Sequence, residues 1–311
     1  MFEGINAEQN YNSRTGFKLV SSGGYFHSLP KDPLKIFIDC IAEAQRALGF
    51  ENEKDHPEVA PSQFELNYKY TDALIAADQI QLYKLTARQV AANQGITASF
   101  LPKPVAGING SGMHCNISLA KDGKNLFYDK NGEDGLSEMG WTFVDRLLQS
   151  ANDICLLINS SVNSYRRLDP HFEAPNQIKS SAVDRTSMVR IPLANQNSAR
   201  IEVRTVAPDA NPYLAFYGLL QTGLNGPLLE NPTEQRRTRT RFLPDNIYDA
   251  IRLFKSSELT TSIMGEDNKE KYADLKTASA NRCPRDLGSL VKTSEILFHH
   301  EVTNQYLWSQ F

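Results

Sequence analysis

The segment SARIEVR, residues 198–204, carries three charged side chains whose types and spacing could do chemistry. Side chains alternate along a β-strand, so Arg200, Glu202 and Arg204 share one face while the two aliphatic residues between them point to the other. A glutamate flanked by arginines could form an anion site with a metal ligand at its centre. The same stripe could also be a solvated surface whose ion pairs contribute little to stability. The pattern alone leaves both interpretations open.

A second polar face occurs in the strand-like segment MHCNISL, where His114, Asn116 and Ser118 alternate with Cys, Ile and Leu side chains. A glycine-rich run at 107–112 directly precedes it, and glycines let the backbone approach a ligand closely. The combination indicates a loop and a strand that could present ligands together. A lone histidine on a strand is nevertheless more often packed or solvated than bound to a metal.

Two further carboxylates, Glu58 and Glu65, flank a proline-containing turn in PEVAPSQFEL. Such a turn could bring both of them to one cation. Carboxylates together with an imidazole suit Mg²⁺ or Mn²⁺, and arginines suit phosphate groups. Considered singly, each glutamate is more often an ordinary surface carboxylate.

The composition excludes several classes of function. Lys and Arg total 33 against 36 Asp and Glu in 311 residues, for a net charge of −3, which argues against general nucleic-acid binding. The four cysteines form no CxxC pair, so neither a disulfide framework nor a zinc knuckle is indicated. The opening MFEGINAEQN lacks the features of a signal peptide, and no stretch has the roughly 20 apolar residues that cross a bilayer. We therefore expect a soluble, cytoplasmic protein with no membrane partner.

The elements that must position these residues follow from periodicity and turn signals. A helix is predicted between Asp32, which can cap it, and Gly49, which ends it. In PSQFELNYKY apolar and polar residues alternate, which predicts a strand, and a second helix runs from about Thr71 to Asn93 before Gly95.

The rest of the chain continues this mixture. Residues 98–129 predict a glycine-rich loop, a strand, an Asp122-Gly123 hairpin turn and a short strand. Later elements are a long helix at 136–159, a polar functional loop at 163–187, strands in MVRIPL and ARIEVRTV, a helix from Asn211-Pro212, and a helical remainder ending in SEILFHHEVTNQYLWSQF. Alternating groups of strands and helices predict the α+β class, and no boundary divides residues 1–311, so a single domain is expected.

Together, these segments resemble the catalytic domain of type I (bacterial) glutamine synthetases. The matching stretches are HPEVAPSQFEL, ASFLPKP, NGSGMHCNISL, NSYRRLDPHFEAP, DRTSMVRIP, RIEVR and DANPYLAF, in the family's order over residues 56–216. The resemblance implies a curved, mainly antiparallel sheet flanked by helices. It also implies an ATP-dependent glutamate–ammonia ligase, in which glutamate takes the γ-phosphate of ATP and ammonia then displaces phosphate from γ-glutamyl phosphate.

The resemblance assigns roles residue by residue. Glu58 and Glu65 match the ligands of one divalent cation, Mg²⁺ or Mn²⁺, and His114 and Glu202 match those of the other. Residues that match ATP contacts are Glu53, Tyr70, Asn116, Ser118, Arg190 and Arg200. Residues that match contacts of L-glutamate are Asn109, Gly110, Arg167 and Arg204. Three residues match catalytic groups. Arg185 matches the arginine at the transferred phosphoryl group, and Tyr25 matches a tyrosine at the ammonium pocket. Glu173 matches a glutamate that lies on the loop covering the site and helps deprotonate ammonium.

The sequence also departs from the family pattern. A β-grasp domain of about one hundred residues precedes the catalytic domain in such enzymes, and nothing here corresponds to it, so we expect an N-terminally truncated catalytic domain. The family's Glu-x-Glu pair, one ligand for each cation, also has no match, which predicts weaker divalent binding at both sites. Asp184 replaces the usual asparagine before Arg185 and adds negative charge near a phosphate-binding arginine.

Three functions follow as hypotheses. The first is an active glutamate–ammonia ligase that uses L-glutamate, ammonium and ATP. The second is an inactive or regulatory fragment, since two metal ligands and a neighbour-facing domain have no match. The third is a γ-glutamyl ligase that accepts a larger amine. Family members assemble into two stacked hexameric rings, so the resemblance implies a homo-oligomer, a dodecamer.

Overall fold

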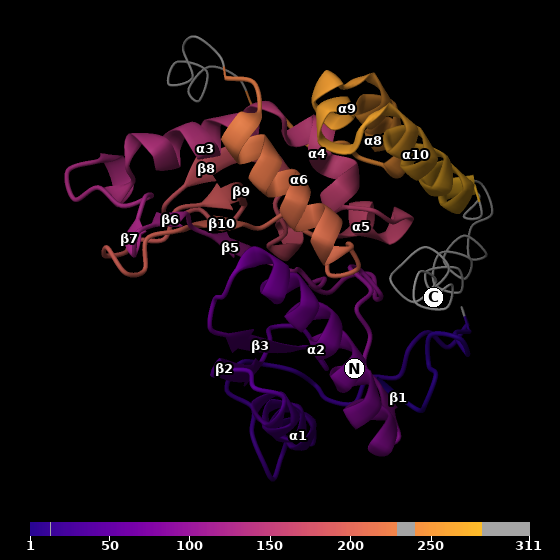
Figure 1. Ribbon diagram of the computed structural model, residues 1–311. Coiled ribbons are helices and arrows are strands. Elements are labelled where there is room, and N and C mark those ends of the chain that lie inside the picture. Colours follow the sequence, from indigo (N-terminus) through magenta and orange to yellow (C-terminus); the bar gives the residue numbers. More distant parts are fainter. Residues whose placement is uncertain (13, 229–239, 282–311) are drawn as a thin grey trace. The chain divides into compact units, whose positions relative to one another are not determined.

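Two helices and an antiparallel hairpin build the first of two units in the computed structural model, Met1–Ser111 (Figure 1). The structure describes residues 1–12, 14–228 and 240–281. The first unit contains β1 (Phe2–Glu3), α1 (Leu34–Ala47), β2 (Asn52–Pro57), β3 (Phe64–Tyr68), α2 (Ala73–Asn93) and β4 (Ile96–Thr97). The two helices and the β3 strand expected from the sequence are confirmed.

Helix α1 begins and ends at the predicted signals. Asp32 Oδ1 accepts a hydrogen bond from the Leu34 N–H at 2.9 Å, and Gly49 adopts the left-handed conformation, with φ of 87°, just beyond the helix. The helix buries Phe37 and Ile41 fully, and they belong to one core with Leu66 of β3. Burial of each such side chain contributes about 1.5–3 kcal/mol, so α1 anchors the hairpin beside it.

The β2–β3 hairpin sets the positions of several charged side chains. Its strands are antiparallel, with His56 opposite Glu65 and Pro57 opposite Phe64. The connecting residues close tightly, because the Glu58 N–H donates to the Gln63 carbonyl at 2.8 Å.

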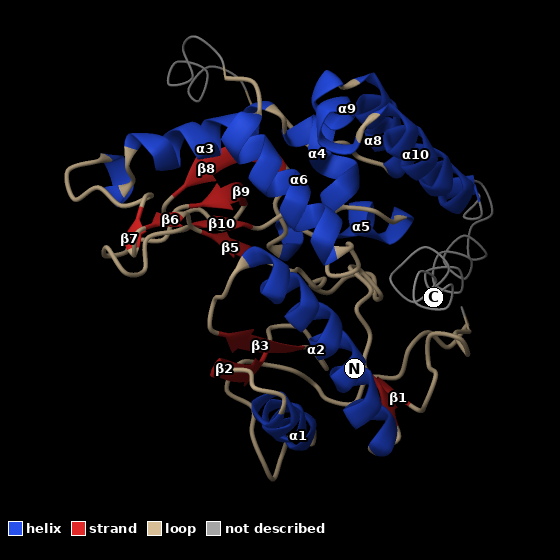
Figure 2. Ribbon diagram, viewed as in Figure 1, coloured by secondary structure: helices blue, strands red, loops and turns tan. Residues whose placement is uncertain are grey.

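A four-stranded sheet covered by helices forms the second unit, Gly112–Asn281 (Figure 2). The strands of the four-stranded sheet are β5 (Cys115–Ile117), β8 (Gln177–Ser181), β9 (Ser187–Arg190) and β10 (Ile201–Val203), and the unit also contains the pair β6 (Ala120–Lys121) and β7 (Lys124–Asn125). Its α-helices are α3 (Glu138–Gln149), α4 (Ala151–Ile158), α5 (Val162–Arg167), α6 (Pro212–Asn225), α8 (Ile247–Ser256), α9 (Glu258–Met264) and α10 (Glu266–Asn281), with short 3₁₀ turns at Glu133–Gly135 and Pro170–Phe172.

The main sheet has the order β5-β10-β9-β8. Strand β10 is antiparallel to both neighbours, and β8 is parallel to β9. The predicted hairpin around Asp122-Gly123 is confirmed as the β6–β7 pair. The expected α+β class, with a mainly antiparallel sheet flanked by helices, is therefore confirmed.

The core of the second unit lies between this sheet and the helices α3 and α6, which run along one side of it (Figure 1). Val189, Ile201 and Val203 of the strands are fully buried there with Leu147 of α3 and Leu219 of α6. Because side chains alternate, the one residue between Ile201 and Val203 on β10 faces away from these helices. No helix in the described ranges is both long and apolar enough to cross a membrane.

Three local expectations need correction. The single helix predicted at 136–159 is two helices, α3 and α4, because Ser150 leaves the helical conformation at φ −98° and ψ 13°. The segment predicted as a functional loop contains α5 and the strand β8. The strands β1, β2 and β4 were not predicted. Residues 282–311 of the predicted helical remainder lie outside the described residues.

Candidate functional site

Glu202 lies at the middle of the second unit's sheet. Its Cα partners are Asn116 on β5 and Arg190 on β9, so strands flank it on both sides. Only 7% of Glu202 and 8% of Arg204 are exposed. The solvated-surface interpretation of SARIEVR is therefore wrong for these two residues.

Two guanidinium groups and one imidazole surround the Glu202 carboxylate. Its Oε2 accepts a hydrogen bond from Arg190 Nη1 at 3.1 Å, and its Oε1 accepts one from Arg204 Nη1 at 2.9 Å. His114 Nδ1 lies 3.2 Å from Oε1. Burial raises the pKa of Glu202, but the His114 hydrogen bond and the two arginines outweigh it and bring the pKa to about 2. We call His114, Arg190, Glu202 and Arg204 the Glu202 centre.

The His114 ring sits at the edge of this centre, with 34% of its side chain exposed. Partial burial lowers its pKa, the charges of Arg204 and Arg167 act in the same direction, and Glu202 opposes them. A neutral imidazole is the form that can ligate a metal.

Arg167 supports the centre from the end of α5. Its guanidinium is 3% exposed and donates to the carbonyls of Arg204 at 2.8 Å and of Thr205 and Val206 at 3.3 Å. Burial lowers its pKa to about 10, with a further contribution from the charge of Arg204. Three carbonyls thus fix Arg167 against the chain that leaves β10.

Gly112 makes room for this arrangement. A Cβ atom there would overlap Arg167 Nη2 and lie 3.0 Å from His114 Nε2. The last glycine of the run noted in the sequence is therefore a close-approach position, which only glycine fills without displacing a neighbour.

The remaining nucleotide candidates of this unit lie along the same strands. Arg200 Nε donates to Asn116 Oδ1 at 2.9 Å, and its Nη1 donates to the Ser198 carbonyl at 3.0 Å. Asn116 and Ser118 are both exposed. The structure therefore pairs two residues, Arg200 and Asn116, that the sequence assigned to ATP.

Arg185 follows β8 on an exposed turn, and its carbonyl accepts a hydrogen bond from Arg204 Nε at 3.1 Å. Next to it, the Asp184 carboxylate is paired with Lys179 Nζ at 2.7 Å and accepts from Thr186 N and Oγ1. The Lys179 contact, followed by the Thr186 hydrogen bonds, lowers the Asp184 pKa to about 2. The extra charge noted in the sequence is thus balanced locally by a lysine.

Glu173 ends the 3₁₀ turn at Pro170–Phe172 in the left-handed conformation, with φ of 59° and ψ of 14°. This conformation is uncommon for a residue other than glycine. It presents Glu173 on an exposed loop, as the resemblance predicts.

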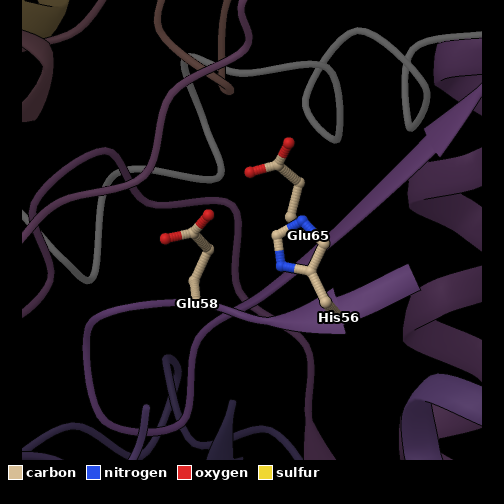
Figure 3. Close-up of side chains that lie close together, drawn as sticks. All are labelled: His56, Glu58 and Glu65. Carbon is tan, nitrogen blue, oxygen red and sulfur yellow. The ribbon is translucent and has the colours of Figure 1, made fainter. Parts of the chain in front are cut away.

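Three ligating side chains converge in the first unit. His56, Glu58 and Glu65 each offer one donor atom, and these atoms all lie within 4.8 Å of one another (Figure 3). Burial, followed by contact with Glu65, raises the pKa of Glu58, against opposing hydrogen bonds from Val59 and Tyr25. The two glutamates were predicted from the sequence, whereas His56 was not, although it lies two residues before Glu58.

The neighbouring segment SSGGY packs against this cluster. The Tyr25 ring lies 6.0 Å from the His56 ring, centroid to centroid, and Tyr25 hydrogen-bonds the Glu58 carboxylate. Gly23 has φ of 82°, and a Cβ there would lie 2.6 Å from the Pro61 backbone. A side chain at position 23 would collide with the Pro61 backbone. Gly23 therefore lets the segment that carries Tyr25 pass close to the turn between Glu58 and Glu65.

The glycine-rich loop joins the same region. Gln63 Nε2 donates to the Gly110 carbonyl at 2.8 Å and contacts Ser111 Oγ at 3.1 Å. The turn between Glu58 and Glu65 thus holds Gly110, and with it the adjoining Asn109.

Glu53 and Tyr70 lie at the other end of the hairpin and are both exposed, Tyr70 by 78%. Their common neighbour is Lys69, whose pKa is raised first by its hydrogen bond to Glu51 and to a lesser degree by Tyr70 and Glu53. The predicted ATP and glutamate sets therefore each have members in both units.

Both ligand groups suit a divalent cation chemically, but unequally. Glu58 and Glu65 with an imidazole offer oxygen and nitrogen donors of the kinds that Mg²⁺ and Mn²⁺ accept. Glu202 and His114 offer the same kinds, yet both carboxylate oxygens of Glu202 already accept arginine hydrogen bonds. A cation there would share the carboxylate with the arginines.

The described residues thus contain a buried carboxylate held by two arginines beside an imidazole, and a separate group of two carboxylates and an imidazole. Residues 3–289 match the family described as glutamine synthetase, catalytic domain. The chain belongs to this family, whose members are enzymes.

The relatives are bacterial glutamine synthetases. That of Clostridium saccharobutylicum is 39% identical over 285 residues, covering 87% of this chain and 64% of the relative. That of Staphylococcus aureus strain MRSA252 is 36% identical over 274 residues, covering 84% and 61%. The chain thus spans about three fifths of the length of these relatives.

Two solved structures are similar in fold. The GmaS/ADP complex in conformation 1 has a TM-score of 0.70 and 33% identity, covering 79% of this chain and 60% of that one. Apo GmaS without ligand has a TM-score of 0.68 and 32% identity, covering 79% and 59%.

Proposed function

We propose that this chain carries out the ATP-dependent ligation of L-glutamate with ammonium, through γ-glutamyl phosphate. The observation that carries the proposal is the Glu202 centre, a buried carboxylate held by Arg190, Arg204 and His114 within a family of ligases. The name of the GmaS/ADP complex, a structural neighbour, adds support for nucleotide binding.

The arginines of the second unit would act on the phosphates and on glutamate. Phosphoryl transfer is catalysed mainly by positioning and by neutralising charge, which fixed guanidinium groups do. Arg190 and Arg200 would contact the nucleotide phosphates, and Arg185 the transferred group. Arg204 and Arg167 would bind the glutamate carboxylate, as the resemblance implies.

Bound divalent cations would neutralise phosphate charge, and Glu58 with Glu65, and His114 with Glu202, are the residues that would hold them. The amine side would use Glu173 and Tyr25, the first to take a proton from ammonium and the second to line its pocket. Closure of the exposed Glu173 loop would exclude water from the acyl phosphate.

The remaining assignments complete the proposal. We infer that Glu53, Tyr70, Asn116 and Ser118 contact ATP, and that Asn109 and Gly110 contact glutamate. A single catalytic region over residues 1–311 and a homo-oligomeric assembly stay predictions.

The test is ADP release by the purified chain with ATP, Mg²⁺ or Mn²⁺, glutamate and ammonium, omitting each in turn. Release that needs both glutamate and ammonium supports the proposal, and Glu202→Gln should abolish it. The exposed Glu43→Gln on α1 serves as the control. Faster release with an alkylamine than with ammonium would replace ammonia by a larger amine as substrate. No release from a folded chain would contradict ligase activity of this chain.

A further inference from the structure

The hairpin geometry places His56 where a metal ligand would lie. His56 and Glu65 are direct cross-strand partners in the β2–β3 register, so their side chains share one face. Glu58 follows two residues after His56, which returns it to that face. Figure 3 shows the imidazole and the two carboxylates projecting from the same side of the hairpin, and their donor atoms lie within 4.8 Å of one another.

A backbone contact sets the His56 ring for ligation. His56 Nδ1 lies 2.9 Å from the Pro57 carbonyl, and a carbonyl oxygen can only accept a hydrogen bond. Nδ1 therefore carries the proton, and in the neutral ring Nε2 bears the lone pair. Metal-binding histidines use this arrangement, in which one ring nitrogen donates to a backbone carbonyl and the other binds the metal.

The two carboxylates are also held in place by hydrogen bonds. Glu58 Oε2 accepts from the Val59 N–H at 2.9 Å, and Glu65 Oε1 accepts from Asn67 Nδ2 at 3.1 Å. Among the described residues, neither glutamate forms an ion pair with a lysine or arginine. Two carboxylates without a cationic side chain, beside a lone-pair donor, are a charge pattern that a divalent cation would complete.

We propose that His56 is a third ligand of the cation held by Glu58 and Glu65, and that it gives this site a preference for Mn²⁺, Co²⁺ or Zn²⁺ over Mg²⁺. Imidazole suits these transition metals, whereas Mg²⁺ prefers oxygen ligands and water. The ligand set deepens the proposed function, on which it rests for the cation at Glu58 and Glu65.

The first test detects a nitrogen ligand directly, by pulsed electron paramagnetic resonance of Mn²⁺ bound to the whole chain. His114→Gln removes the imidazole of the second predicted site and is the reference. In that background ¹⁴N coupling to Mn²⁺ should persist, and His56→Gln should abolish it and weaken Mn²⁺ binding roughly tenfold or more. Mg²⁺ affinity should change less than about threefold. Unchanged nitrogen coupling or Mn²⁺ affinity would overturn the assignment.

A second measurement uses the unmodified chain, in case the variants do not fold. Mn²⁺ should protect His56 Nε2 from diethyl pyrocarbonate, as mapped by peptide mass spectrometry, while Mg²⁺ at the same concentration protects less. His171, whose side chain is 90% exposed, is the internal control. Equal modification of His56 with and without Mn²⁺ would overturn the assignment. Neither readout requires turnover, so a chain that binds Mn²⁺ through His56 without forming glutamine would contradict only the proposed activity.

Discussion

The Glu202 centre of the second unit and the His56–Glu58–Glu65 cluster of the first unit both combine glutamate with an imidazole, but the centre also contains two arginines. In the centre, one carboxylate accepts hydrogen bonds from two arginines, and its pKa falls to about 2. In the cluster, two carboxylates lie together, and burial and the neighbouring Glu65 raise the pKa of Glu58. Arginines of the chain itself neutralise the carboxylate of the centre, whereas the two carboxylates of the cluster are neutralised only when a cation or a proton binds.

This difference teaches which part of the candidate site is preorganised. Arg190, Arg204 and Glu202 hold one another in place and need no ligand to do so. The cluster around Glu58 and Glu65 should tighten on binding. Removing a carboxylate should therefore have opposite consequences for stability in the two places.

The largest expected effect comes from breaking the balance of the centre. Glu202→Ala leaves two arginines without their buried partner and should destabilise the chain by about 3–5 kcal/mol. Glu65→Gln in metal-free buffer should change stability by less than about 1 kcal/mol, or increase it, because it relieves like-charge repulsion. Urea denaturation followed by circular dichroism measures both. Equal losses in the two variants would remove the contrast.

The next largest effect is the stabilisation of the first unit when a cation binds the His56–Glu58–Glu65 cluster. Mn²⁺ at a hundred times its dissociation constant should stabilise the first unit by about 2.7 kcal/mol, since it binds only the folded state. Hydrogen exchange should slow in α1 and β3, and the double variant Glu58→Gln/Glu65→Gln should lose this protection. Protection confined to β10 would place the tighter site in the second unit instead.

A smaller loss of stability is expected at Gly112, where the packing beside the centre requires a residue without a side chain. Gly112→Ala forces Arg167 away from the carbonyls that hold it, and should cost about 1–3 kcal/mol of stability, as overpacking does. Combined with Arg167→Met, the alanine should cost much less than it does alone. A double-mutant cycle with additive effects would show that the two residues do not interact.

The smallest effect concerns the Asp184 turn beside Arg185. Its pKa of about 2 lies below the ordinary value of 3.8, so the ionised form stabilises the fold above that value. The contribution is lost as the pH falls from about 4 towards about 2. Lys179→Met should raise the Asp184 pKa towards 3.8, measured by NMR titration. An unchanged pKa would mean that the Thr186 hydrogen bonds alone lower it.

Much of the scaffold could be predicted because its signals are local. The Asp32 side chain that accepts from the Leu34 N–H, the left-handed Gly49 and the alternation around Leu66 lie within a few residues of the elements they define. The shared face of Arg200, Glu202 and Arg204 was likewise a consequence of strand periodicity. Its burial was not, because β10 is central only when β5 and β9 pair with it from distant parts of the chain.

The features that were not predicted from the sequence likewise depend on contacts or conformations that leave no local signal. His56 gains its meaning from the register that sets it opposite Glu65, and register depends on a turn that sequence alone does not fix. Strand β8 has the sequence QIKSS, with a single aliphatic residue, so its pairing with β9 leaves little local signal. The apolar pattern continues on both sides of Ser150. Periodicity therefore predicts one continuous helix and does not show the break at Ser150.

The parallel pairing of β8 with β9 sets a minimum length for the segment that connects them. Gln177 lies beside Ser187, and Ser181 beside Arg190, so residues 182–186 must carry the chain back along the whole of β8. That return covers about 14 Å, while the six Cα steps involved reach at most about 20 Å. A loop two residues shorter could not span this distance and still turn. We therefore expect the segment to tolerate substitution, as at the exposed Val183, far better than deletion. In distant relatives, the length of segment 182–186 should be conserved even where its residues differ.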